Sequence, residues 1–201
     1  MHGLASDKAG HIFVADSGNA RVQVFDTQGQ YLMEVGSLTT PVDVEASSIP
    51  GRVYVRDIGI AGVHRITIDW ELLQVESQVA WSNIHRGGDS QGYGITEDRG
   101  FVYISGRPLG VAPPRTALSA PLHTFQVNQY GNVHASWQSG ASFYGKTIDP
   151  RENFAGLLVE ITKDLNNITS VVRYNTLYGS ISSEWRAGGD EAGQFNAPIS
   201  I

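Results

Sequence analysis

The chain has 201 residues and a formal net charge of −6, and 41% of its residues are hydrophobic whereas only 17% are charged. This composition is typical of a folded globular domain. It disfavours a nucleic-acid partner, because phosphate binding needs clustered Lys and Arg and the 14 such residues are scattered. The absence of Cys excludes disulfides and thiolate metal sites, and no apolar run approaches the roughly 18 residues of a membrane helix.

The first 36 residues contain four short segments with strand patterning, separated by clusters of Asp, Gly and Asn. Alternation of apolar and polar residues indicates half-buried strands, and the clusters between them supply turn conformations. We expect strands at 3–6, 12–15, 21–25 and 31–35. Four antiparallel strands in so short a stretch are the size of one propeller blade.

The run VADSGNARVQVFDTQGQYL, which covers residues 14–32, resembles an NHL repeat. The resemblance implies an all-β fold, a β-propeller of NHL type. Members of that family typically close with six blades, so it also implies that this chain is a fragment of a longer propeller.

Three further units follow at blade-sized spacing. They match the first unit in the positions and number of their strands, but not in the motif itself. Asp16 and Asp57 end equivalent strands and lie 41 residues apart. The second strand of each later unit is expected at 52–57, 101–105 and 157–161. In the second unit the outer strand is expected at 72–75, with 79–81 as its extension or as a separate edge piece. We place the blades at 2–38, 41–86, 92–139 and 143–187.

One interruption and one incomplete unit complete this organisation. The segment from Gly106 to Pro121 contains four prolines and no alternation, so we expect an inserted loop that leaves one face of the propeller. Residues 188–201 resemble the linker and first strand that open another repeat, and we expect the next blade to start at 195–201. Because both ends have the same phase, we expect four blades plus the first strand of a fifth, in an open arc. A closed ring of four blades is the alternative.

The first strand of each blade lines the central channel of a propeller, so candidate ligand-binding residues are sought there. Aligning the strand starts gives His2, Val42, Tyr93, Tyr144 and Ile199 as channel-facing positions. The next position in each strand is Gly3, Asp43, Gly94, Gly145 and Ser200. From these sets we take His2, Asp43, Tyr93 and Tyr144 as the candidate ligand-binding residues.

A metal site is not supported within this chain. His2-Gly3-Leu4 is similar to the metal-ligand strands of peptidylglycine amidating lyases, which bind zinc through one His from each of several blades. Zinc needs three or four converging ligands, and Val42, Tyr93, Tyr144 and Ile199 occupy the equivalent positions here. Zinc or calcium would therefore need ligands from further blades of a complete propeller, and no cofactor is indicated.

Other polar residues have structural interpretations. Asp16 in the Asp-Ser-Gly-Asn turn is expected to pair with Arg21 and to bond the nearby backbone. Arg52 and Arg56 alternate along a strand, and we expect them to form one solvated face. The remaining histidines are scattered, and we expect each of them to have hydrogen-bond partners or to lie at the surface.

Two functions are consistent with these features. The sequence contains no HExxH motif, and a linker between blades explains the glycine-rich string from Gly87 to Gly92, which favours a non-catalytic scaffold that binds a protein or small-molecule ligand. The alternative is part of a metal-dependent propeller enzyme of the lyase or lactonase type, with its site in the central channel.

Overall fold

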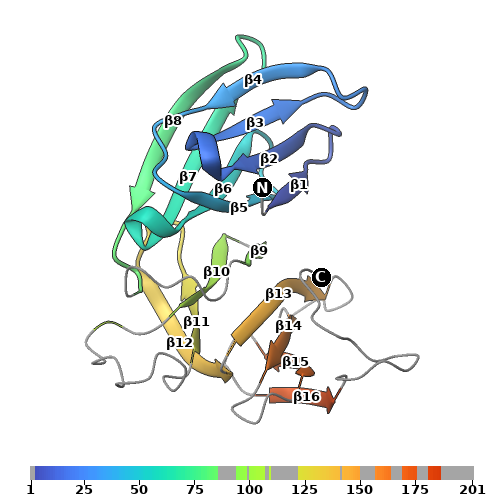
Figure 1. The fold of residues 1–201 in the computed structure, drawn as a ribbon, viewed down its shortest axis with the longest axis vertical. Coiled ribbons are helices and arrows are strands. Elements are labelled where there is room, and N and C mark those ends of the chain that lie inside the picture. Colours follow the sequence, from blue (N-terminus) through green and yellow to red (C-terminus); the bar gives the residue numbers. More distant parts are fainter. Residues whose placement is uncertain are drawn as a thin grey trace.

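Four sheets, each of four antiparallel strands, make up the computed structural model (Figure 1). It describes residues 3–85, 94–98, 100–106, 109, 122–140, 142–149, 157–163, 169–175 and 181–186. Every sheet is a meander in which strands adjacent in sequence are adjacent in space. We call the sheets blades one to four in chain order. The predicted all-β propeller fold is confirmed, and the described residues include no α-helix.

The strands of each blade follow one another closely along the chain. Blade one contains β1 (Leu4–Ser6), β2 (Ile12–Asp16), β3 (Arg21–Phe25) and β4 (Tyr31–Val35). Blade two contains β5 (Pro41–Ala46), β6 (Arg52–Asp57), β7 (Gly62–Asp69) and β8 (Gln74–Trp81). Blade three contains β9 (Ile95–Asp98), β10 (Phe101–Gly106), β11 (Leu122–Val127) and β12 (Val133–Gly140). Blade four contains β13 (Ser142–Asp149), β14 (Leu157–Lys163), β15 (Thr169–Asn175) and β16 (Ile181–Arg186).

Blades one and two repeat the same local geometry after their second strands. A short 3-10 helix follows each, η1 (Ser17–Asn19) and η2 (Ile58–Ile60). The next residue is left-handed in both cases, with φ of 52° at Ala20 and at Ala61. The structural repeat therefore matches the spacing of Asp16 and Asp57. In blade two, β8 runs without a break to Trp81, so residues 79–81 extend the outer strand.

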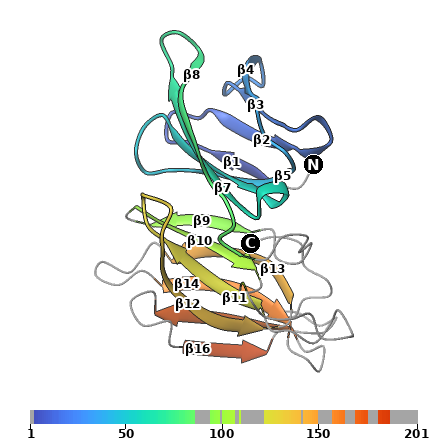
Figure 2. The ribbon, with the colours of Figure 1, turned by 90° about the vertical axis from the view of Figure 1, so that its left-hand side faces the viewer.

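The blades are stacked face to face around an arc. The inner strands β1, β5, β9 and β13 lie next to one another in that order. Figure 1 shows the arc open between blade one and blade four, and the view in Figure 2 shows the sheets as successive layers. Residues 199–201, which we expect to start a fifth blade, lie outside the described residues.

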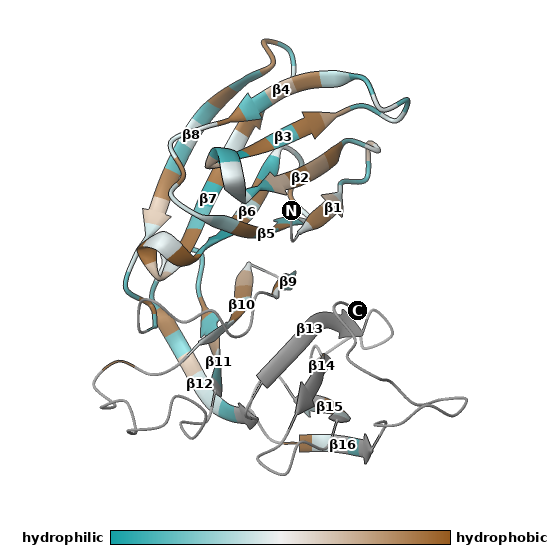
Figure 3. Cartoon of the chain, in the orientation of Figure 1, coloured by the Kyte–Doolittle hydropathy of each residue, from teal (hydrophilic) through white to brown (hydrophobic). Residues whose placement is uncertain are grey.

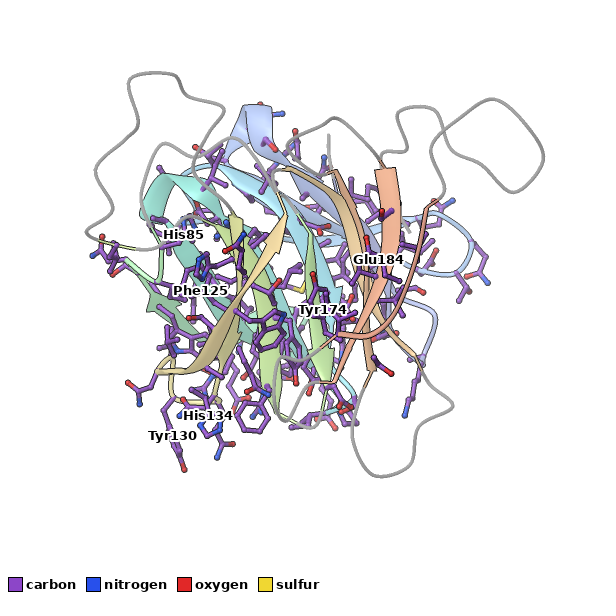
Figure 4. The ribbon with its side chains drawn as sticks, turned by 90° about the horizontal axis from the view of Figure 1, so that it is seen from below. His85, Phe125, Tyr130, His134, Tyr174 and Glu184 are labelled. Carbon is purple, nitrogen blue, oxygen red and sulfur yellow. The ribbon has the colours of Figure 1, made fainter. Side chains whose placement is uncertain are left out.

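Apolar side chains fill the spaces between successive blades. The largest cluster joins blades one and two and includes Phe13, Val24, Val44 and Val55. Figure 3 shows how hydrophobic and hydrophilic residues alternate along these strands. A second cluster joins blades two and three around Phe125, and a third includes Tyr174 of blade four (Figure 4). Burial of apolar surface between layers is thus what holds the arc together.

The boundary of the predicted insertion needs one correction. Gly106 is the last residue of β10 and is paired with His123 of β11, so the segment between the strands starts after it. Of that segment only Leu109, an exposed turn residue, is among the described residues.

In the described part of the chain, no helix has the length and apolar character needed to cross a membrane.

The hairpin formed by β11 and β12 reaches back toward blade two. Arg65 of β7 donates a hydrogen bond from Nη1 to the main-chain oxygen of Gln129, at 2.8 Å. The tip of this hairpin is exposed, and Figure 4 shows Tyr130 and His134 at its outer end.

Candidate functional site

The four predicted ligand-binding residues are described to different extents. His2 and Tyr93 lie outside the described residues, and Tyr144 is described only as a residue of β13. Asp43 lies on β5, the inner strand of blade two.

Asp43 lies where the inner strands of three blades meet. Its Oδ2 accepts a hydrogen bond from the main-chain N–H of Ile95 on β9, at 3.0 Å. Its Oδ1 accepts one from the N–H of Val44, also at 3.0 Å. On the other side is Gly3, immediately before β1, where a Cβ atom would collide with the Asp43 carboxylate. Glycine at position 3 is thus what allows the carboxylate to sit between the blades.

Arg56 is the cross-strand neighbour of Asp43 and is fully buried, with 0% of its surface exposed. Its Nη2 donates to the main-chain oxygen of Ser105 at 2.7 Å, and its Nη1 donates to that of Gly62 at 3.2 Å. Nη1 also lies 2.5 Å from Nε2 of His85. The guanidinium therefore bridges blades two and three.

The burial of Arg56 contradicts the prediction that Arg52 and Arg56 form one solvated face. Strand alternation correctly places both residues on the same side of blade two. That side, however, is covered by blade three, where the main-chain oxygen of Ser105 accepts one of the hydrogen bonds of Arg56. A charged side chain is tolerated there because main-chain oxygens accept its hydrogen bonds.

Burial raises the pKa of Asp43 to about 7, although the hydrogen bonds from Ile95 and Val44 and the charge of Arg56 oppose that rise. Glu45, two residues further along β5, behaves similarly. Burial, together with the nearby charge of Asp43, raises the pKa of Glu45 to about 7. Both carboxyl groups therefore change charge near neutral pH.

Glu97 of β9 continues this row of carboxyl groups. Its Oε1 accepts from the N–H of Gly100 at 2.8 Å. Its Oε2 accepts from the N–H of Ser48 at 3.2 Å and from the hydroxyl of Ser47 at 3.3 Å. Beside it, the hydroxyl of Thr96 lies 3.4 Å from Oε1 of Glu45. We call Asp43, Glu45 and Glu97 the acidic row.

The acidic row consists of half-buried residues, with the buried Arg56 next to Asp43 on the neighbouring strand. Such an arrangement can accept hydrogen bonds from a polar ligand or pair with a cationic one. Among the described residues, no group of three or more His, Cys, Asp or Glu side chains is arranged to hold a metal ion.

Reasoning from sequence identified Asp43 but missed the other members of this site. The Asp43-Val44-Glu45 alternation on an expected inner strand was an available signal for Glu45. No sequence signal linked Glu97 or His85 to Asp43, because they belong to other blades or to the segment that follows blade two.

The Asp residues at the ends of the second strands have structural roles. As predicted, Arg21 pairs with Asp16, its Nε lying 3.0 Å from Oδ2. The expected bond from Asp16 to the nearby backbone is wrong, because its carboxylate does not cap η1 and bonds the side chains of Asn19 and Gln23 instead. Hydrogen bonds from Asn19 and Arg21 lower the pKa of Asp16. In blade two the equivalent Asp57 is fully buried and bonds to His64 and to backbone N–H groups.

Comparison with known proteins supports the repeat and the fold. The family model for the NHL repeat matches residues 2–25. A search of curated proteins found no significant match. Among solved structures, hydrazine synthase of Kuenenia stuttgartiensis aligns with a TM-score of 0.63 and 13% identity, over 96% of this chain and 55% of that one.

Two further solved structures have the same fold. Virginiamycin B lyase from Staphylococcus aureus aligns with a TM-score of 0.56 and 14% identity, over 99% of this chain and 72% of that one. A chain of a nidogen/laminin complex aligns with a TM-score of 0.52 and 12% identity, over 92% of this chain and 79% of that one. The chain thus spans only about half of the hydrazine synthase chain. The chain has a β-propeller fold, and residues 2–25 of its first blade match the NHL repeat.

Proposed function

We propose that this chain is a propeller binding scaffold for a protein or small-molecule ligand, and that the acidic row contacts a cationic group of that ligand. The observation that carries the proposal is the position of Asp43. Asp43 is half-buried, and its carboxylate lies against Gly3 of blade one and bonds to Ile95 of blade three. A ligand at that point would meet three inner strands at once.

The charge state of the row gives the proposal its chemistry. Burial holds the pKa values of Asp43 and Glu45 near 7, so a cation that approaches them favours the ionised forms. Binding of a cationic group should therefore strengthen as pH rises from about 6 to about 8. A ligand that lacks a positive charge should not show this dependence.

The test uses an octapeptide rich in arginine and its glutamine-rich counterpart, titrated by calorimetry. We expect Asp43→Asn to weaken binding of the basic peptide about tenfold or more, because a hydrogen bond to a charged group contributes about 1.5–3 kcal/mol. Asp69→Asn is the matched control, since Asp69 is the last residue of β7 and accepts hydrogen bonds from the N–H groups of Glu71 and Leu72. Equal effects of the two substitutions, or no binding of the basic peptide, would overturn the proposal.

A second candidate function is a metal-dependent enzyme of the lyase type. Two observations favour it: the fold is similar to that of virginiamycin B lyase, and two carboxyl groups with pKa values near 7 suit general acid–base chemistry. Metal analysis of the full-length protein distinguishes the two functions. Stoichiometric zinc or calcium that survives dialysis would favour the enzyme.

A further inference from the structure

A pocket of about 280 Å³ lies between blades one and two, at the end of the sheets where the β1–β2 and β5–β6 turns are found. Its apolar walls are Phe13 of β2 and Trp70, which follows β7. The polar part of the lining comes from the two turns and includes Asp7, Lys8 and Ser48. The volume is close to the lower limit of typical small-molecule sites.

The Trp70 ring is held in place before any ligand binds. The imidazole of His11 stacks on it with ring centroids 3.8 Å apart and planes inclined by 14°. Asp7 fixes that imidazole through a 2.8 Å contact between its Oδ2 and Nδ1 of His11. His11 does not line the pocket, so the pocket contacts the parts of Trp70 that His11 leaves uncovered. A preorganised indole is a suitable wall for a flat ring.

The charges around the pocket favour an anion. Lys8 and Arg52 line it, and within the described part of the chain Lys8 forms no ion pair. Asp7 is the one acidic residue of the lining, and its two oxygens already bond to the N–H groups of Ala9 and His11 and to the His11 ring. The acid nearest to Ser48 is Glu97, which accepts hydrogen bonds from Ser47, Ser48 and Gly100. Lys8 is thus the cation that a ligand can pair with here, because the Arg52 side chain shares with Tyr54 and Arg56 the face of blade two that blade three covers.

We propose that this pocket binds a small molecule with one planar aromatic ring and one carboxylate. The ring packs against Trp70 and Phe13, and the carboxylate pairs with Lys8 at the exposed rim. Asp43 does not line this pocket, although Glu97 of the acidic row bonds Ser47 and Ser48 of its lining, and the pocket takes an anion where the acidic row takes a cation. Either proposal can therefore fail without the other.

The probe is indole-3-acetate, with the neutral indole-3-acetamide as its partner, and calorimetry measures both. We expect saturable binding of the acid below about 1 mM, and binding of the amide that is about tenfold weaker. Lys8→Gln should bring the acid down to the affinity of the amide. Lys146→Gln, on β13 of blade four, is the control and should leave both affinities unchanged.

The aromatic wall is tested separately with Trp70→Leu, which keeps an apolar side chain but removes the ring. It should weaken the acid and the amide by the same factor, and unfolding curves establish that the variant is folded. If Trp70→Leu does not fold, Lys8→Gln decides alone, because Lys8 is an exposed turn residue. The proposal is wrong if the acid does not bind up to about 5 mM. It is equally wrong if acid and amide bind alike, or if Lys8→Gln behaves as the wild type.

Discussion

Replacing Asp57 with alanine should be among the most damaging single changes in this fold. Asp57 is fully buried at the end of β6. Oδ2 accepts from the N–H of Thr39 at 2.7 Å and lies 3.1 Å from Nε2 of His64. Oδ1 accepts from the N–H groups of Thr40 at 2.8 Å and Gly59 at 2.9 Å. One carboxylate thus fixes the linker between blades one and two, the turn after β6 and a buried imidazole.

The magnitude follows from these four hydrogen bonds. Each N–H that Asp57→Ala leaves buried and unpaired costs about 1–3 kcal/mol, and with partial relaxation we expect a total loss of about 3–5 kcal/mol. The pKa supports this scale. Burial alone would raise the pKa of Asp57, but the hydrogen bonds from His64 and the backbone outweigh it and lower the pKa to about 2. That shift corresponds to about 2–3 kcal/mol in favour of the ionised form.

The assay is urea unfolding followed by tryptophan fluorescence, in which the expected loss moves the midpoint by about 2 M. The control is Asp16→Ala, the equivalent change in blade one. Asp16 is partly exposed and its bonds are to side chains that water can satisfy, so this change should cost less. The contribution of Asp57 should be present above about pH 4 and be lost as pH falls toward 2, because its folded-state pKa is the lower one. Equal losses for the two variants would refute the reasoning.

Three other outcomes are expected. Burial raises the pKa values of Asp43 and Glu45 to about 7, so their contribution to stability should fall as pH rises through 7. The urea midpoints measured at about pH 5.5 and at about pH 8 should therefore differ less in the Asp43→Asn, Glu45→Gln double variant than in the wild type. Gly62→Ala should cost at least about 2 kcal/mol in thermal unfolding, because its Cβ would overlap a main-chain oxygen of the residue that ends β8, whereas Gly18→Ala meets no atom within 4 Å and should be tolerated. Ser105→Ala should change the free energy of unfolding by no more than about 0.5 kcal/mol, because its buried Oγ has no hydrogen-bond partner in the described structure; a large loss would reveal one.

The candidate site could be predicted only in part. Asp43 was identified because the local sequence pattern shows where each strand of a blade begins and ends. These positions determine which residues lie on the inner strand. Arg56 was misjudged by the same local reasoning. Alternation predicts that one face of a strand is solvated, but both faces of blade two are covered by its neighbours. A polar side chain on either face must then find its hydrogen-bond partners in a neighbouring blade.

The sequence by itself determined the elements of this protein: four units of four strands, their turns, and the equivalent positions of Asp16 and Asp57 at the ends of two strands. These depend on contacts between residues close in the chain, such as the Asp16–Arg21 pair and the turn after β6. Only the tertiary structure decided the rest. It placed Gly3 and Ile95 against Asp43, and Ser105 against Arg56, from blades far apart in sequence. It also set the charge states of Asp43 and Glu45, because the stacking of blades removes water from carboxyl groups that the sequence alone leaves ordinary.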